Sequence, residues 1–371
     1  MQINNISIRN FRNYDNLELD FNSRINIFIG DNAQGKTNLL ESIYVLAITK
    51  SHRIFIDNNL IKNKEIYTKI KGTIISNNTK KNLEILINSK GKSVKINNNI
   101  IKKISDYISN FNVIIFYPDD LELIKGNPSV RRKFLNIEIS QLNNKYLSIL
   151  NEYNLILKDR NNYLKDIRIE NVDKTYIDIL NNKLVEKGLY IFKLRKEFLD
   201  DISIKISSIY ENIYGKKDIK IKYNSNIDFD NYNEKDIKLK YLEKLNNNLK
   251  REILQGTTLY GPHRDDFSFI IEEEEIKEYG SQGQHRLAVL CIKLAELEIF
   301  KEKKGEYPIL LLDDVFSELD EKKKNNIIKY IGKDIQTFIT TTDIKNINEQ
   351  LLNDSTIFEI LDGNILNKTT K

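Results

Sequence analysis

The chain has 371 residues, 40% of them hydrophobic and 30% charged, which is ordinary for a soluble globular protein of two or three domains and excludes a disordered chain. Lys and Arg number 58 against 53 Asp and Glu, and the resulting net charge of +5 permits a nucleic-acid partner without requiring one. A single cysteine, Cys291, excludes an internal disulfide framework, and a small buried position on a helix is its simplest interpretation.

The apolar segments argue against export and membrane insertion. The N-terminal MQINNISIRNF alternates apolar and polar residues like a strand and lacks the apolar core of a signal peptide. No apolar run approaches the roughly 20 residues that cross a bilayer. We therefore expect a soluble, cytoplasmic protein without a membrane partner.

The N-terminal segment predicts the first half of an α/β nucleotide domain. The segments INNISIRNF, NLELDF and INIFIG have the pattern of strands, and residues 36–48 carry apolar side chains at helical spacing. The loop between the last strand and this helix, residues 30–37, reads GDNAQGKT. Its spacing is G-x-x-x-x-G-K-[ST], the pattern of the phosphate-binding P-loop.

Each part of this loop has a physical reason. The two glycines let the backbone turn its N–H groups toward phosphate oxygens, and the following helix adds its positive N-terminal end. Lys36 is expected to reach the β and γ phosphates, and the Thr37 hydroxyl to ligate Mg²⁺. The residues predicted to bind the nucleotide are Gly30, Asp31, Asn32, Ala33, Gln34, Gly35, Lys36 and Thr37. The alternative is a glycine-rich turn that binds nothing.

The remaining elements alternate between strand and helix. Residues 66–100 are expected to form an antiparallel meander, residues 131–214 a helical hairpin or small bundle, and residues 256–271 a strand, a turn and a strand. The elements expected after them are a helix at 284–303, a buried strand at 307–314, a helix near 321–331, and the strands QTFITT and TIFEIL. We predict a nucleotide domain built from residues 1–115 and 257–371, with a helical second domain, residues 116–256, inserted between them.

The strand YPILLLDD ends in two carboxylates. The carboxyl end of a buried parallel strand is where α/β sheets place ligands. Asp313 is positioned to hold Mg²⁺, directly or through water, and Asp314 to orient or deprotonate an attacking water. Alone, the pattern also fits an ordinary strand followed by a helix cap. Combined with the P-loop it is typical of a Walker B segment, and the pair favours nucleotide hydrolysis.

A third segment, GSQGQHRLAVL at residues 280–290, resembles the signature motif of the ABC-type ATPases. A serine hydroxyl and free N–H groups at a helix start form an anion site. In ABC-type ATPases the signature of one subunit closes on the γ-phosphate bound by the other, so the resemblance implies an ATP-dependent homodimer. The signature residues predicted to contact ATP are Ser281, Gly283 and Gln284. The alternative is an ordinary N-capped helix. SELD at 317–320 looks like the D-loop that touches the opposite subunit.

Further stretches resemble the RecF family of bacterial recombination mediators. They are NFRNY at 10–14, KSHR at 50–53, FYPDDLELIKGNPSVRRKFL at 116–135 and TTLYGPHRDD at 257–266. The resemblance implies an ABC-type P-loop ATPase head with an inserted α-helical domain as a short arm. It also implies a slow, DNA-stimulated ATPase that dimerises with ATP on single-stranded, linear or gapped DNA. The implied roles are recombinational repair, replication restart and support of the SOS response, with RecR and RecO as partners.

Several residues carry open alternatives. Arg131, Arg132 and Lys133 could line a DNA surface or form a solvated helix start. His263 and Arg264 fit a structural turn or a contact of the nucleotide-bound dimer, and no second His or Cys has zinc-ligand spacing nearby. The acidic run at 272–275 fits a solvated hairpin. ITTTDI lacks the histidine that many ABC ATPases place there, which leaves Thr342 or Asp343 as candidate γ-phosphate sensors.

Two other functions fit part of the pattern. A transporter-type ABC subunit would couple the same cycle to a membrane partner, and stimulation of hydrolysis by DNA would exclude it. A structural DNA-binding protein would bind nucleotide and scarcely hydrolyse it, and its DNA binding would survive Lys36→Met.

Overall fold

Two compact units make up the chain in the computed structural model. The structure describes residues 1–169, 175–215, 219–228, 233–318, 324–325, 327–329, 332, 334–347 and 349–370. Unit 1 comprises Met1–Asp120 with Leu290–Lys371, and unit 2 comprises Leu121–Val289. Unit 1 is therefore assembled from both ends of the chain. Within the described residues no helix is both long and apolar enough to cross a membrane.

One sheet of unit 1 is parallel apart from its last strand. Its order is β15-β14-β3-β13-β12-β8, and only the β14–β15 pair is antiparallel. The strands are β3 (Ile25–Ile29), β8 (Val113–Phe116), β12 (Ile309–Asp313), β13 (Thr337–Thr341), β14 (Ser355–Leu361) and β15 (Asn364–Thr370). The central strands are near-continuous apolar runs, as expected for a parallel sheet that is covered on both faces. Their carboxyl ends meet at one edge.

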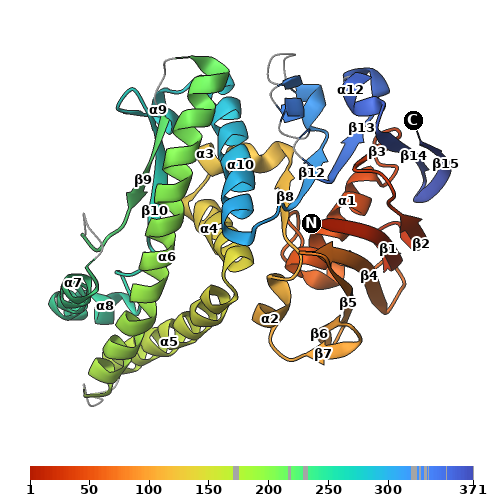
Figure 1. Ribbon diagram of the computed structural model, residues 1–371. Coiled ribbons are helices and arrows are strands. Elements are labelled where there is room, and N and C mark those ends of the chain that lie inside the picture. The colour runs from red at the N-terminus through yellow and green to blue at the C-terminus, as the bar shows by residue number, and fades with distance from the viewer. Residues whose placement is uncertain are drawn as a thin grey trace. The chain divides into compact units, whose positions relative to one another are not determined.

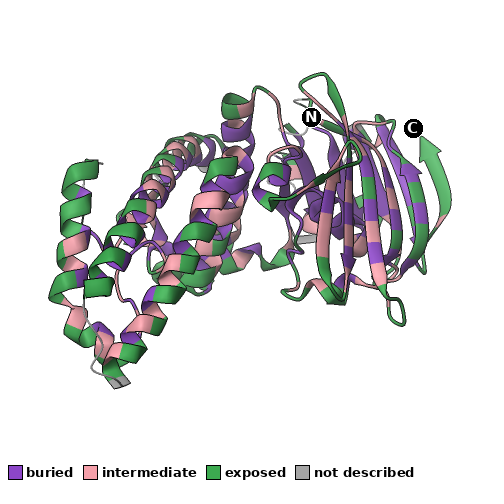
Figure 2. Ribbon diagram, turned by 90° about the horizontal axis from the view of Figure 1, so that it is seen from below, coloured by how far each residue is buried: buried purple, intermediate pink, exposed green. Residues whose placement is uncertain are grey.

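The second sheet of unit 1 is antiparallel and has the order β2-β1-β4-β5-β6-β7. Its strands are β1 (Gln2–Phe11), β2 (Tyr14–Asp20), β4 (Tyr67–Ser76), β5 (Thr79–Asn88), β6 (Gly91–Ile96) and β7 (Asn99–Ile101). Buried and exposed side chains alternate along these strands (Figure 2), because one face packs on the core. This confirms the meander expected at 66–100, which continues the sheet begun by β1 and β2.

Helix α1 (Lys36–Ile48) contacts strands of both sheets, including β13 and β12 of one and β4 and β1 of the other (Figure 1). It is buried around nearly its whole circumference, with Leu39, Ile43 and Leu46 each at 0% exposure. Apart from buried Glu41 and Ser42, the residues after its first turn are apolar or aromatic, which is typical of such an enclosed position. Burial of each of the three aliphatic side chains stabilises the unit by roughly 1.5–3 kcal/mol, so the helix that follows the P-loop is held firmly.

Short elements complete unit 1. They are η1 (Asp57–Leu60), α2 (Ile104–Ile108), η3 (Val315–Glu318), η4 (Ile344–Asn346) and α12 (Glu349–Leu352), with η2 (Pro118–Leu121) at the junction between the units. Of the helix expected near 321–331, residues 324–325 and 327–329 are helical and the others lie outside the described residues.

Unit 2 is mainly helical, as the sequence predicts for 131–214. Its helices are α3 (Glu122–Lys125), α4 (Pro128–Leu142), α5 (Asn144–Ile169), α6 (Thr175–Tyr214), α7 (Glu234–Asn247), α8 (Leu249–Gln255) and α9 (Ile276–Tyr279). The long helices α5 and α6 pack side by side (Figure 1). A small sheet of order β11-β10-β9 joins β9 (Ile219–Asn224), β10 (Asp266–Ile271) and β11 (Glu274–Glu275). Helix α10 (Gln282–Lys304) begins in unit 2 and ends in unit 1.

The segment 257–265 differs from the prediction, because only 266–271 of the expected strand-turn-strand is a strand. Its backbone N–H groups are bonded by side chains instead of a neighbouring strand. The N–H of Thr258 donates to Asn161 at 2.7 Å, that of Leu259 to Glu252 at 2.7 Å, and that of Gly261 to Asn226 at 3.0 Å. These bonds satisfy the backbone without a sheet.

The limits of the compact units also differ from the predicted ranges. The units meet at Asp120/Leu121 and Val289/Leu290, whereas the prediction separates 115 from 116 and 256 from 257. Residues 257–289 lie in unit 2 because β10 pairs antiparallel with β9 over six residues. The strands β8, β9 and β15 were not predicted. The expected hairpin at 272–275 is confirmed, with exposed Glu272 and Glu273 at its turn.

Candidate functional site

The predicted phosphate loop connects the end of β3 to the start of α1, where only glycine fits at two positions. A Cβ on Gly35, whose φ is +115°, would lie 2.6 Å from Asn13 Nδ2, and one on Gly30 would lie 2.3 Å from the carbonyl oxygen of Ile360. The backbone is therefore closely surrounded by β1–β2 and β14. Asp31, Asn32 and Ala33 are exposed at the outer turn of the loop, and Gln34 is half-buried.

Lys36 points back across the loop. Its Nζ donates to the carbonyl oxygens of Gly30 and Asp31, both at 2.7 Å, and the side chain is buried. Burial lowers the pKa of Lys36, while Asp314, Asp313 and Asp31 act in the opposite direction. Among the described residues, no carboxylate lies within ion-pair distance of the Lys36 ammonium, which donates to backbone carbonyls instead. Such a lysine is better suited to the oxygens of an anionic ligand than to a structural ion pair.

Thr37 and Asp313 meet at the sheet edge although they lie far apart in the sequence. Thr37 Oγ1 donates to Asp313 Oδ1 at 2.8 Å, and Thr340 Oγ1 donates to the same oxygen at 2.7 Å. The N–H of Asp314 donates to Thr340 Oγ1 at 2.9 Å. Burial raises the pKa of Asp313, and the two threonine hydroxyls oppose this shift. The donor set of hydroxyl and carboxylate oxygens fits the hard-oxygen preference of Mg²⁺.

Residues that sequence reasoning did not assign to the site brace the loop. Tyr14 OH donates to the carbonyl of Gly35 at 3.0 Å, and Asn13 Nδ2 donates to that of Gln34 at 3.3 Å. From β14–β15, the N–H of Asp362 donates to Gln34 Oε1 at 2.7 Å. Asn13 and Tyr14 belong to NFRNY, a stretch noted only for its resemblance to a family. The polar residues of this stretch, at the end of a predicted strand, were the one feature of the sequence that could have indicated a role near the site.

A buried carboxylate anchors the arginine of the same stretch. Glu41 of α1 is fully buried and receives a two-point contact from Arg12, with Nε and Nη2 each at 2.8 Å from a carboxylate oxygen. Ser51 Oγ also donates to Glu41. Arginine and the serine hydroxyl hold the pKa of Glu41 below its usual range despite its burial. This contact fixes the β1–β2 turn against the helix that follows the P-loop.

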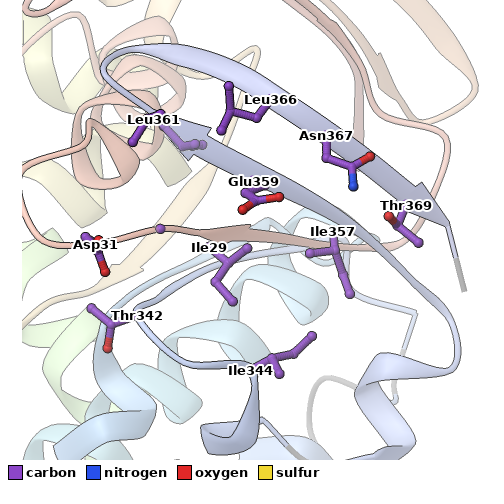
Figure 3. Close-up of a pocket in the computed structure, with 12 residues that line it drawn as sticks. Ile29, Asp31, Thr342, Ile344, Ile357, Glu359, Leu361, Leu366, Asn367 and Thr369 are labelled. Carbon is purple, nitrogen blue, oxygen red and sulfur yellow. The ribbon is translucent and has the colours of Figure 1, made fainter.

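A pocket of about 410 Å³ borders the first residues of the loop on the side of β14 and β15. Figure 3 shows Asp31 and Thr342 at one end of it, with Ile29, Ile357 and Glu359 farther along. The neighbouring Asp343 instead accepts a hydrogen bond from the N–H of Lys345 at 2.9 Å and caps η4. Of the two candidate γ-phosphate sensors, Thr342 therefore shares an open space with the P-loop.

Comparison with known proteins agrees with these features. Residues 2–360 match the family described as RecF/RecN/SMC N terminal domain. The chain is 41% identical over 370 residues to the DNA replication and repair protein RecF of Staphylococcus epidermidis, covering 99% of this chain and 100% of that protein. The chain belongs to the RecF family. RecF of Listeria monocytogenes serotype 4b is also 41% identical, over 98% of this chain and 99% of that protein.

Solved structures place the RecF family fold among the ABC-type ATPase heads. The chain matches the recombination mediator protein RecF-ATP in the RecFOR pathway with a TM-score of 0.93 and 35% identity, over 99% of this chain and 97% of that one. The RecF-ATPrS structure gives a TM-score of 0.92, also at 35% identity, over 100% and 98%. An Smc head domain from Pyrococcus furiosus matches at 0.54 and 14% identity over 99% and 96%, which shows a shared fold alone. The predicted ABC-type α/β ATPase fold is confirmed.

The signature segment of this RecF-family chain lies at the start of α10. Ser281 and Gly283 are exposed and Gln284 is half-buried. The N–H of Gln284 donates to Ser281 Oγ at 3.2 Å, and the N–H of Ser281 donates to Gln284 Oε1 at 2.8 Å. This reciprocal pair is a capping box, the helix start that the sequence left as an alternative. It also leaves the serine side chain at the surface. Of the D-loop stretch, Ser317 and Glu318 end η3, while Leu319 and Asp320 lie outside the described residues.

The three basic residues of α4 have different environments. Arg131 is buried, donating to both carboxylate oxygens of Asp266 at 2.6 and 2.8 Å and to carbonyl oxygens that include Gly126 at 3.0 Å. Its buried guanidinium is therefore not accessible to a DNA backbone, and its position does not support the expectation that it lines a DNA surface. Arg132 is half-buried and Lys133 is exposed.

His263 and Arg264 lie in the irregular segment that precedes β10. His263 Nε2 is 3.1 Å from the carbonyl oxygen of Thr258, so this nitrogen donates, and Nδ1 accepts from Tyr153 OH at 2.7 Å. Burial lowers the pKa of His263 to about 4, so the ring is neutral near pH 7. Arg264 also donates to the Thr258 carbonyl, at 3.1 Å. Both residues hold the turn in place, which is one of the two alternatives for them.

Proposed function

We propose that the chain is an ATP-dependent DNA-binding protein of recombinational repair and replication restart that dimerises with ATP and hydrolyses it slowly. The proposal is supported by the name of its relatives, DNA replication and repair protein, and by the RecF-ATP structure it resembles. We assign the ATPase head to unit 1 and the short arm to unit 2. We further propose cytoplasmic localisation, RecR and RecO as partners, and a contribution to the SOS response, following the family resemblance.

The observation that carries the ATPase proposal is the contact between Thr37 and Asp313 at the end of the P-loop. Two oxygens that suit Mg²⁺ lie within 2.8 Å of each other, next to an ammonium that faces backbone oxygens. Bound MgATP would supply the phosphoanhydride and the charge-neutralising ion. We propose that Lys36 contacts the phosphates, that Thr37 and Asp313 hold Mg²⁺, and that Asp314 orients the attacking water.

The signature serine is proposed to act on the ATP of a second subunit. Ser281 and Gly283 are exposed at the first turn of α10, a helix of 23 residues, whose N-terminal end favours an anion. The side-chain amide of Gln284 would provide a further hydrogen-bond donor to that ATP. ATP bound in each P-loop would then be covered by the partner's signature segment, and hydrolysis would open the dimer.

The dimer is proposed to bind single-stranded, linear or gapped DNA chiefly through phosphate contacts, with Arg132 and Lys133 as candidates. Such contacts carry little base information. Because they release counterions from the DNA, the affinity should fall steeply as the salt concentration rises. DNA, and no membrane protein, should stimulate hydrolysis. This stimulation distinguishes the proposal from a transporter-coupled ATPase.

Sedimentation with and without ATP, in the presence of gapped, single-stranded or intact duplex DNA, tests the proposal. Lys36→Met should abolish ATP binding and DNA retention. Ser281→Arg should spare ATP binding and prevent dimerisation, whereas Ser281→Ala, which removes the same helix cap without adding bulk, should still dimerise. Normal ATP-dependent dimerisation of Ser281→Arg would reject the cross-subunit arrangement. Unchanged DNA binding by Lys36→Met would reject the ATP dependence.

A further inference from the structure

Unit 2 contains a second polar cavity, of about 140 Å³, between α4, α5, α6 and the turn at Pro262–His263. Polar side chains of all these elements line it: Arg132, Asn136, Tyr153, Asn154, Arg195 and His263. Arg195 is 2% exposed, whereas Asn154 is exposed and Arg132 half-buried. The cavity therefore has a buried cationic wall and a mouth that reaches solvent. Cavities of roughly 150 Å³ admit a molecule the size of benzene, so a tetrahedral oxyanion fits.

The charges around this cavity do not balance. Arg131 is paired with Asp266 at 2.6 Å, and Arg160 with Glu252 at 2.7 Å. Arg132, Arg195 and Arg264 remain. Two carboxylates act on Arg132, and since Asp266 is already paired with Arg131, Asp265 is left to offset the three arginines. Three positive charges against one negative charge leave an excess of two. The pKa of Arg132 is lowered by burial and by the nearby charge of Arg195, which reflects this crowding.

Asp265 offsets only one of the three positive charges, and its hydrogen bonds go to groups other than these arginine side chains. It accepts hydrogen bonds from the Tyr223 hydroxyl at 2.5 Å and from Ser225 Oγ at 3.2 Å, and it is fully buried. Its nearest approach to Arg195 Nη1 is 3.8 Å, longer than a hydrogen bond. Asp265 therefore offsets part of the charge of Arg195 without a hydrogen bond to it, and an excess of positive charge remains at the cavity.

Both cavity arginines keep donors beyond those already bonded. A guanidinium carries five N–H donors. Arg132 uses Nη1 on the carbonyl of Asp265 at 2.8 Å. Arg195 donates to Tyr146 OH at 3.1 Å, to Asn136 Oδ1 at 3.0 Å and to the carbonyl of Pro262 at 2.5 Å. The bonds from Arg195 fix its fork in place, so little further ordering is required to bind an anion.

We propose that this cavity is an oxyanion site that binds a phosphate group, held by the guanidinium groups of Arg132 and Arg195 at the centre and by Asn154 at the mouth. Arginine forks match phosphate oxygens in two-point geometry, and the half-enclosed surroundings strengthen each contact. A phosphodiester inside a strand, flanked by nucleosides on both sides, is too large for the cavity. The phosphate is therefore free or terminal, as inorganic phosphate or as the phosphate at a DNA end. The DNA source rests on the proposed function, whereas inorganic phosphate does not.

Calorimetric titration with inorganic phosphate tests the site itself, using full-length Lys36→Met to silence the P-loop. Adding Arg132→Gln should weaken phosphate binding about tenfold or more, since charge-assisted hydrogen bonds are lost. The matched control is Lys193→Gln, which removes one exposed positive charge from α6, another helix that borders the cavity, and should leave the affinity within about twofold. Thermal unfolding of each variant verifies that the fold is kept. Absence of phosphate binding, or equal losses in the two variants, would overturn the proposal.

A second titration distinguishes the two phosphate sources. One oligonucleotide is compared in 5′-phosphorylated, 3′-phosphorylated and unphosphorylated forms, at fixed salt. If the ligand is a DNA end, one phosphorylated form binds about tenfold tighter and Arg132→Gln removes that advantage. If all three forms bind equally while inorganic phosphate binding still depends on Arg132, the site takes free phosphate. General loss of DNA binding with phosphate binding intact would count against the proposed function and not against this site.

Discussion

The P-loop site of unit 1 and the buried Arg160–Glu252 pair of unit 2 use charged residues in opposite ways. In unit 1, the ammonium of Lys36 donates to backbone carbonyls, and the carboxylate of Asp313 accepts hydrogen bonds from two threonine hydroxyls. In unit 2, Arg160 and Glu252 are both 0% exposed and lie 2.7 Å apart. Charges without a full counter-charge suit an external ligand, whereas a paired and buried charge supports the fold.

The contrast also separates residues that are neighbours in the sequence. Arg131 and Arg132 are consecutive, yet Arg131 is saturated by Asp266 and backbone carbonyls while Arg132 lines an open cavity. Two arginines next to each other therefore differ in whether they can bind a ligand. What decides this is how deeply each side chain is buried and how many of its N–H donors are already in hydrogen bonds.

The largest effect is expected from breaking the buried pair of unit 2. Arg160→Met should lower the free energy of unfolding by about 3–5 kcal/mol, because Glu252 would be left charged and buried without a partner. Arg160 also donates to Asn181 at 2.7 Å and Thr258 at 2.8 Å, so neighbouring contacts would be lost as well. Urea unfolding followed through unit 2 helicity measures this change. Arg160→Met/Glu252→Leu should recover much of it, and a loss below about 1 kcal/mol in the single variant would show that the pair is not needed.

A smaller effect is expected from removing a hydroxyl that supports the proposed Mg²⁺ ligand Asp313. Thr340→Val removes the hydroxyl that bonds both Asp313 and the N–H of Asp314. Outer contacts of this kind typically change metal affinity about 10–100-fold, so the Mg²⁺ concentration needed for half-maximal hydrolysis should rise by that factor. Thr337→Val is the matched control, since Thr337 lies on the same strand and its hydroxyl donates to the carbonyl of Ile335, which precedes the strand. Equal Mg²⁺ requirements in the two variants would contradict the role of Thr340.

A third prediction concerns pH and the neutral histidine of unit 2. The pKa of His263 is lowered to about 4, below its value of about 6.5 in the unfolded chain, so its neutral form stabilises the fold above pH 6.5. That contribution is lost as pH falls from 6.5 toward 4. The buried Asp265, with its pKa raised to about 6, acts in the opposite direction but is present in both proteins compared.

His263→Gln should therefore lose less stability than the unchanged chain between pH 7 and pH 5, by on the order of 1–2 kcal/mol. Urea unfolding at the two pH values measures the difference. An identical pH dependence in the two proteins would show that His263 is charged or exposed in the folded state.

The strength of sequence reasoning lay in local patterns. GDNAQGKT and LLLDD each occupy one short segment, so their spacing places Lys36, Thr37 and Asp313 without knowledge of the fold. Thr340 and Asn13 could not be found in this way, because their roles depend on strands that meet only in the sheet. The sequence predicted a strand-turn-strand over 256–271, but side chains of α5 and α8 bond the backbone of 257–265 instead of a neighbouring strand.

Buried charge was the least predictable feature. Arginine is rarely fully buried unless it is paired, and nothing in the sequence near Arg160 or Arg195 identifies Glu252 or Asn136 as the partner. The strand β9 was missed because IKIKYN lies between long helical patterns, and its own pairing with β10 is what places residues 257–289 in unit 2.

Mixing two inactive variants tests the central claim most directly. Lys36→Met lacks a working P-loop but keeps Ser281, whereas Ser281→Arg keeps its P-loop but lacks a working signature. In a mixed dimer, the P-loop of one subunit would face the intact Ser281 of the other, giving one complete composite site. We predict that each variant alone hydrolyses ATP at background rate with DNA present, and that the mixture regains a clear fraction of the activity. A mixture as inactive as its components would contradict a site shared between two subunits.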